Sequence, residues 1–60
     1  MIAKRGGVVA RIEHRPHRAR HRWIVRYCNR RLYWWCLHNS EIGARRCVAR
    51  TLNEAARRAG

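Results

Sequence analysis

Three short apolar stretches, separated by polar segments, lie along the first two thirds of the chain and predict three β-strands. The strands are expected over residues 8–13, 22–28 and 32–37, where branched and aromatic side chains recur at every second position. Asn29 and Arg30 separate the second stretch from the third. Because Asn tolerates a positive φ, this pair is predicted to form a two-residue hairpin loop.

Side-chain parity tests the register of this hairpin. With a two-residue loop, three apolar pairs share one face of the sheet: Tyr27 with Leu32, Val25 with Trp34, and Trp23 with Cys36. A slip by one residue would mix the faces and bury arginines. The other face then carries Arg22, Ile24, Arg26, Cys28, Arg31, Tyr33, Trp35 and Leu37. The first strand extends the apolar face with Val8, Ala10 and Ile12, and the polar face with Arg11, Glu13 and Arg15.

Small apolar residues at helical spacing predict a helix that ends near Ala59. Asn39 and Ser40 are the expected N-terminal capping residues, and Gly60 is the expected stop. The apolar stripe is Ala44, Val48, Leu52, Ala55 and Ala59, with Cys47 and Thr51 at its edge. We therefore expect an α+β fold of the order β-β-β-α, with one C-terminal helix packed on a three-stranded antiparallel sheet.

The length of 60 residues allows a single domain whose core consists of about one sheet and one helix. Residues 1–7 are expected to form a basic N-terminal arm that ends in Gly6-Gly7, and residues 8–60 to form the domain.

The charge is strongly unbalanced, with 15 Lys and Arg against 3 Asp and Glu and a formal net charge of +12. So few acids can pair only a few of the arginines internally, and the excess charge favours a polyanionic partner. Nucleic acid is the favoured partner because binding to phosphates releases counterions. Membrane surfaces and acidic proteins compete with this interpretation.

The location is predicted to be intracellular and cytoplasmic, or nucleoid-associated if the partner is DNA. The N-terminus lacks the apolar stretch of a signal peptide, and the uncharged apolar run over residues 32–37 is too short to span a bilayer. The three cysteines are odd in number and have no secretory spacing.

The uncovered face of the predicted sheet is the candidate binding surface, since arginines can reach phosphates and exposed rings can stack on bases. The expected contact residues are Arg11, Arg15, Arg22, Arg26, Arg31, Tyr33 and Trp35, with Lys4 and Arg5 from the arm. The alternatives are that a dimer mate or the histidine-rich segment over residues 14–21 covers this face.

Neither a metal site nor an active site is predicted. The chain contains His14, His17, His21, Cys28, Cys36, His38 and Cys47, but no paired C-x-x-C motifs, and parity places Cys28 and Cys36 on opposite faces. The three acids are scattered, and no orienting group accompanies a Cys and His pair. We expect no cofactor, no enzymatic activity and no small-molecule substrate.

The segment Arg22-Trp23-Ile24-Val25-Arg26 resembles the Trp-containing strand of AP2-type DNA-binding domains. The segments Arg31-Leu32-Tyr33-Trp34, Asn39-Ser40-Glu41 and Ala55-Ala56-Arg57 resemble their third strand and Ala-rich helix, and integrase arm-binding domains share the plan. The resemblance spans roughly residues 8–58. It implies that the sheet enters the major groove of DNA, with Arg11, Arg22, Arg26, Arg31, Tyr33 and Trp35 as contact residues.

The leading hypothesis is therefore a small basic module of a phage or mobile element that binds duplex DNA through its uncovered sheet face. One alternative is a protein-interaction module that inhibits or recruits an acidic partner through the Tyr33 and Trp35 face. The other is a protein that binds structured RNA, such as a ribosome-associated protein.

Overall fold

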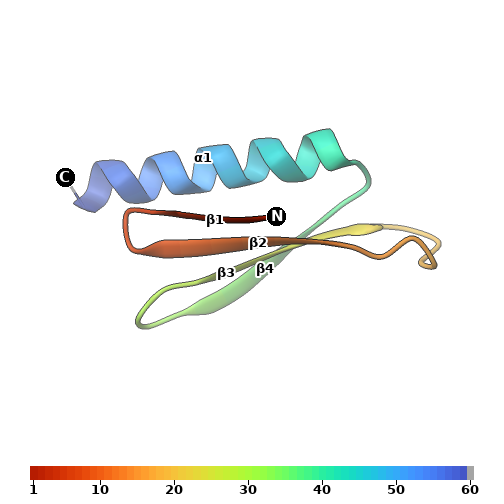
Figure 1. The fold of residues 1–60 in the computed structure, drawn as a ribbon, viewed down its shortest axis with the longest axis horizontal. Helices are drawn as coiled ribbons and strands as arrows, with labels where there is room; N and C mark the ends of the chain where they lie inside the picture. The colour runs from red at the N-terminus through yellow and green to blue at the C-terminus, as the bar shows by residue number, and fades with distance from the viewer. Residues whose placement is uncertain (60) are drawn as a thin grey trace.

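The computed structural model describes residues 1–59, which form one antiparallel sheet with a helix packed on one side of it (Figure 1). The strands are adjacent in chain order, and their bounds are β1 Ile2–Arg5, β2 Val8–His14, β3 Trp23–Cys28 and β4 Tyr33–His38. The helix α1 spans Glu41–Ala59. The predicted α+β class and the C-terminal helix are confirmed, but the sheet has four strands and the prediction of three was wrong.

The additional strand, β1, comes from the segment that was expected to be a basic arm. Gly6 and Gly7 have φ angles of 59° and 80°, which are the left-handed values of a tight hairpin turn. This turn folds β1 back on β2, with Lys4 opposite Val9. Gly-Gly was interpreted as the flexible end of an arm, although it is also a strong signal for a two-residue hairpin.

The loop between β3 and β4 is longer than predicted, and the pairing of these strands is therefore shifted by two residues. Tyr27 is opposite Trp34, and Val25 is opposite Cys36. The cause is Asn29, whose side-chain oxygen accepts hydrogen bonds from the backbone N–H groups of Arg31 and Leu32 at 2.8 Å and 2.7 Å. This capping leaves Leu32 in the loop. An even shift preserves parity, so the two faces of β3 and β4 are as predicted.

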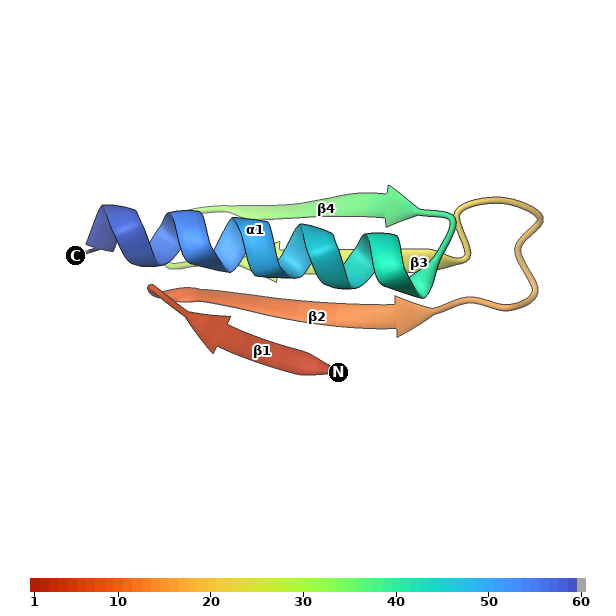
Figure 2. The ribbon, with the colours of Figure 1, turned by 90° about the horizontal axis from the view of Figure 1, so that it is seen from above.

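The core lies between the sheet and the helix. Its buried residues are Val8, Ala10, Val25 and Tyr27 from the sheet and Ala44, Cys47, Val48 and Leu52 from α1. Figure 2 shows α1 running along the strands above β3, with β1 at the edge of the sheet. The predicted apolar stripe of the helix is confirmed except at Ala59, which is exposed because α1 extends past the sheet residues that could cover its last turn.

Ser40 caps the helix as predicted, since its Oγ accepts a hydrogen bond of 3.1 Å from the backbone N–H of Gly43. Asn39, the other predicted cap, instead accepts a hydrogen bond from the backbone N–H of His21, at 3.0 Å. That bond ties the loop between β2 and β3 to the start of the helix. Within residues 1–59 no helix is both long and apolar enough to cross a membrane.

Candidate nucleic-acid interface

The face of the sheet that points away from α1 is not covered by another element of residues 1–59 (Figure 1). The strand register assigns to it Ile2, Lys4, Val9, Arg11, Glu13, Ile24, Arg26, Cys28, Tyr33, Trp35 and Leu37. We call this surface the open face. Ile2, Arg11, Arg26 and Trp35 are directly paired across the four strands and form one row of this surface. Two arginines therefore lie beside each other and next to an indole ring.

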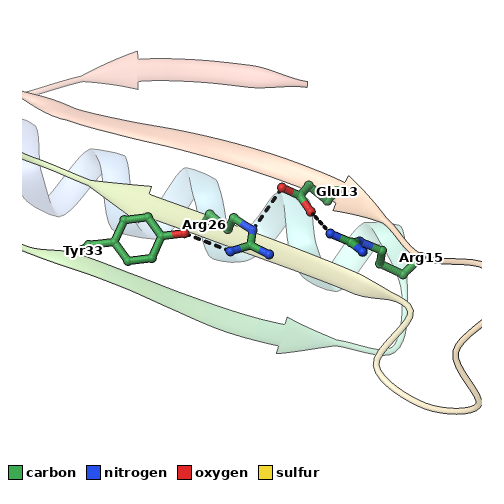
Figure 3. A network of polar contacts seen from close by, with 4 residues as sticks. All are labelled: Glu13, Arg15, Arg26 and Tyr33. Carbon is green, nitrogen blue, oxygen red and sulfur yellow. Dashed lines mark hydrogen bonds and ion pairs between the residues drawn. The ribbon is translucent and has the colours of Figure 1, made fainter.

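A polar network holds two of the basic side chains of the open face, Arg15 and Arg26, in place (Figure 3). Arg15 donates a hydrogen bond of 2.8 Å to Glu13, and the guanidinium of Arg26 donates one of 2.9 Å to the hydroxyl of Tyr33. The Nε of Arg26 also lies 3.0 Å from Oε1 of Glu13, as an ion pair without hydrogen-bond alignment. One carboxylate thus orients two arginines, and Tyr33 extends the network to β4.

The network shifts the ionisation of its members in the directions that keep them charged. The hydrogen bond from Arg15 lowers the pKa of Glu13, and the charges of Arg26 and Arg11 lower it further. The hydrogen bond with Tyr33 and the charge of Glu13 raise the pKa of Arg26 above its ordinary value. Arg11 makes no ion pair with any residue between 1 and 59, so its guanidinium is available to a ligand.

The two aromatic side chains of β4 are largely exposed on the open face. Tyr33 is 57% exposed, Trp35 is 59% exposed, and their rings meet at a tilt of 51°. Ile24, which was expected to be in water, is buried beneath these neighbours. A shallow hollow beside it is lined by Arg18, Ile24, Arg26, Tyr33, Trp35 and Leu37. This hollow presents two guanidinium groups next to two rings, an arrangement that suits a stacked base and its phosphate.

Two of the predicted contact residues, Arg5 and Arg31, lie away from the open face, and a third, Arg22, lies just before the strands that form it. Arg5 points to the helix side, where it donates a hydrogen bond of 2.7 Å to Asn53. Arg22 precedes β3, and its Nε donates to the backbone carbonyl of Arg18 at 3.0 Å. Arg31 lies in the loop between β3 and β4, beside the C-terminal end of α1. The prediction grouped them with the others because it placed Arg22 within the second strand, assigned Arg31 to the same face by parity, and treated Arg5 as part of an arm.

The structure brings the other six together: Lys4, Arg11, Arg15, Arg26, Tyr33 and Trp35. It also adds Arg18 from the loop between β2 and β3, which sequence reasoning did not single out. The signal was the density of arginine in that loop, but a loop has no periodicity from which a face can be assigned. The open face therefore collects five cations, counting Arg18, around one carboxylate.

A second group of polar side chains lies on the helix side of the sheet. Cys36, His38 and Cys47 each place a potential ligand atom within 4.8 Å of the other two. Their residue types suit a soft or borderline metal ion rather than Mg²⁺ or Ca²⁺, which prefer oxygen ligands. This group contributes nothing to the open face.

Comparison with known proteins gives no relative: no family model, no curated protein and no solved structure matches the chain. The resemblance to AP2-type and integrase arm-binding domains therefore stays a prediction. The case for a function depends on the geometry and charge of the open face.

Proposed function

We propose that this protein binds nucleic acid, with duplex DNA as the favoured partner, through the open face of its sheet. The observation that carries the proposal is the combination on one uncovered surface of five cations, one acid and two exposed aromatic rings. Cations supply affinity for the phosphate backbone, and arginines and rings can contact base edges and sugars. The proposal assigns binding to this surface and no catalysis.

The strand dimensions support a groove-binding mode over a purely electrostatic one. A two-stranded ribbon is narrow enough to enter the major groove of B-DNA, and β3 and β4 carry most of the groups that could read bases. The cations of β1 and β2 lie beside them and would contact the flanking phosphates. The AP2-type resemblance likewise implies a sheet in the major groove, with Arg26 and Trp35 among the contact residues.

The test is fluorescence anisotropy of a labelled duplex titrated with the full chain over a series of salt concentrations. If about five phosphates are neutralised, the affinity falls with a log–log slope near −4 to −5. Arg11→Ala should weaken binding and reduce the slope by about 0.9, because one phosphate contact is lost. Trp35→Ala should weaken binding with little change of slope, because stacking does not release counterions.

The matched control is Arg46→Ala, which removes the same charge from an exposed position on α1, away from the sheet. It should leave the slope nearly unchanged. Unlabelled RNA should displace the duplex poorly. A slope near zero, or equal losses in Arg11→Ala and Arg46→Ala, would contradict binding through the open face, and efficient displacement by RNA would favour an RNA partner instead. A complex with an acidic protein that persists at high salt would favour the protein-interaction alternative.

A further inference from the structure

The group formed by Cys36, His38 and Cys47 has the chemistry of a metal site. Cys36 and His38 are two residues apart on β4, so both side chains point to the helix side. Cys47 lies in the second turn of α1, and its ligand atom meets theirs across the interface between helix and sheet. Two thiols and an imidazole are a set that zinc binds in proteins.

The spacing of the ligand atoms is close to what zinc requires. All three atoms lie within 4.8 Å of one another. In a tetrahedral site with Zn–S bonds of about 2.3 Å, neighbouring sulfur ligands are about 3.8 Å apart. Side-chain rotations that move each atom by less than about 1 Å would therefore complete the geometry.

The surroundings of the group contain a second, independent sign of a ligand. The Nε2 of His38 is buried and has no hydrogen-bond partner among residues 1–59. Buried polar atoms are normally paired, so this unpaired nitrogen of a histidine in the Cys36, His38 and Cys47 group indicates a partner that residues 1–59 do not supply. A metal ion would satisfy it.

Tyr27 is placed to support one of the thiols. Its hydroxyl lies 2.8 Å from the Sγ of Cys47. A metal-bound thiolate has no proton to give, so in a metal complex the tyrosine would be the donor of this hydrogen bond. Such hydrogen bonds to ligands orient them and are a usual part of protein metal sites.

We propose that Cys36, His38 and Cys47 bind one zinc ion that fastens α1 to β4. The fourth position goes to water, since no fourth Cys, His or carboxylate side chain among residues 1–59 joins the group. Two thiolates neutralise the dication, so the site adds no charge to the strongly basic chain. For a domain of 60 residues, whose core is small, such a link is a substantial source of stability.

The site is on the strand that also carries the exposed rings of the open face. Cys36 and His38 alternate along β4 with Trp35 and Leu37, which point to the other side. The zinc ion would thus stiffen the strand from behind without contacting the DNA-binding groups. The zinc proposal is independent of the proposed function, because it depends on none of the residues of the open face.

The test uses the full chain, reduced and freed of metal with a thiol-free reductant and a chelator, in a Cys28→Ser background. Cys28 is exposed on the open face, so its removal eliminates the unrelated thiol and itself serves as a control. We expect one zinc ion per chain. At free zinc about a hundredfold above the dissociation constant, the melting temperature should rise by about 10 °C. Co²⁺ should give the visible and near-ultraviolet bands of a tetrahedral site with two thiolates.

The variants Cys36→Ser and His38→Gln should each weaken zinc binding more than about 100-fold, while Tyr27→Phe should weaken it about 10-fold to 100-fold. His17→Gln, in the exposed loop between β2 and β3, is the matched histidine control and should bind as the parent does. The parent's own stoichiometry and Co²⁺ spectrum decide the question even if a variant fails to fold. Absence of stoichiometric zinc in the reduced parent, or equal loss in His17→Gln and His38→Gln, would overturn the proposal. A disulfide between Cys36 and Cys47 in a chain that binds no zinc after reduction would also overturn it.

Discussion

Gly6 contacts the helix so closely that no side chain fits between them. A β-carbon built at this position would lie 2.5 Å from the carbonyl carbon of Ala55 and 2.6 Å from the backbone nitrogen of Ala56. Gly7, which has the same left-handed type of backbone, has nothing within 4 Å of such a carbon. The two glycines therefore have different roles: Gly7 is needed for the turn, and Gly6 for the turn and for packing on α1.

Gly7→Ala and Gly6→Ala separate these two roles. Gly7→Ala should cost about 1–2 kcal/mol of stability, from the positive φ alone. Gly6→Ala should lose the same amount and a further ~1–3 kcal/mol, because helix backbone must move to relieve the overlap. Urea unfolding of both variants, compared through their midpoints, measures the difference. Equal midpoints would mean that the turn of β1 does not pack against the helix.

At the residue level, parity predicted the exposed members of the open face, and contacts between side chains could not be predicted. Alternation placed Arg11, Arg26, Tyr33 and Trp35 on one surface, because a strand leaves only two choices. The pairing of Glu13 with Arg15 and Arg26 depends on rotamers and on a diagonal between strands. In the sequence Glu13 is one of three scattered acids, and nothing there indicates that it orients two arginines.

At the level of elements, the sequence pattern predicted β2, β3, β4 and α1, but β1 was not predicted. Strand β1 is short and carries two charges, so its alternation is weak, and its existence depends on the turn at Gly6 and on pairing with β2. The shifted hairpin between β3 and β4 has a comparable cause. Asn29 was correctly interpreted as a turn residue, but its capping of two N–H groups, which sets the loop length, is a three-dimensional property.

Strand β1 offers a charge-matched test of how the sheet is used. Lys4 lies on the open face and Arg5 on the helix side, and either substitution by alanine lowers the net charge by one. Lys4→Ala should reduce the salt slope of duplex binding by about 0.9 with a stability change within about 0.5 kcal/mol. Arg5→Ala should instead lose ~0.5–1.5 kcal/mol of stability, from the hydrogen bond to Asn53, and leave the slope nearly unchanged.

Parallel salt titrations and urea denaturation of the two variants measure both quantities. The two variants remove the same charge from opposite sides of β1. We therefore expect Lys4→Ala to affect mainly binding and Arg5→Ala to affect mainly stability. If both reduced the slope equally, binding would reflect total charge and not the open face.

At the level of the whole molecule, the two faces of one sheet carry separate chemistry. The open face gathers cations and exposed rings, whereas the helix side brings Cys36 and His38 of β4 against Cys47 of α1. No metal site was predicted from the sequence, because the prediction looked for ligands at short spacing, as in paired C-x-x-C motifs. The group arises from the docking of a helix on a strand, which sequence spacing does not encode.

The charge of the whole chain makes its folding and its proposed binding respond to salt in opposite ways. Of the 15 cations, only Arg15, Arg26 and Arg45 form ion pairs with acids among residues 1–59, so repulsion between the remainder opposes the compact state. Screening shortens the range of this repulsion from about 10 Å at 0.1 M salt to about 3 Å at 1 M.

Between these concentrations the melting temperature should therefore rise by about 5 °C, equivalent to ~1 kcal/mol, while the affinity for duplex DNA falls. Thermal melts in sodium chloride and in sodium acetate at equal ionic strength measure the effect, and equal shifts in the two salts would show that ionic strength, and not a specific anion, is the cause. A melting temperature that falls with salt would mean that the few ion pairs, such as those of Glu13, outweigh the repulsion. The excess charge would then not destabilise the fold, and binding of a polyanion would not be expected to relieve it.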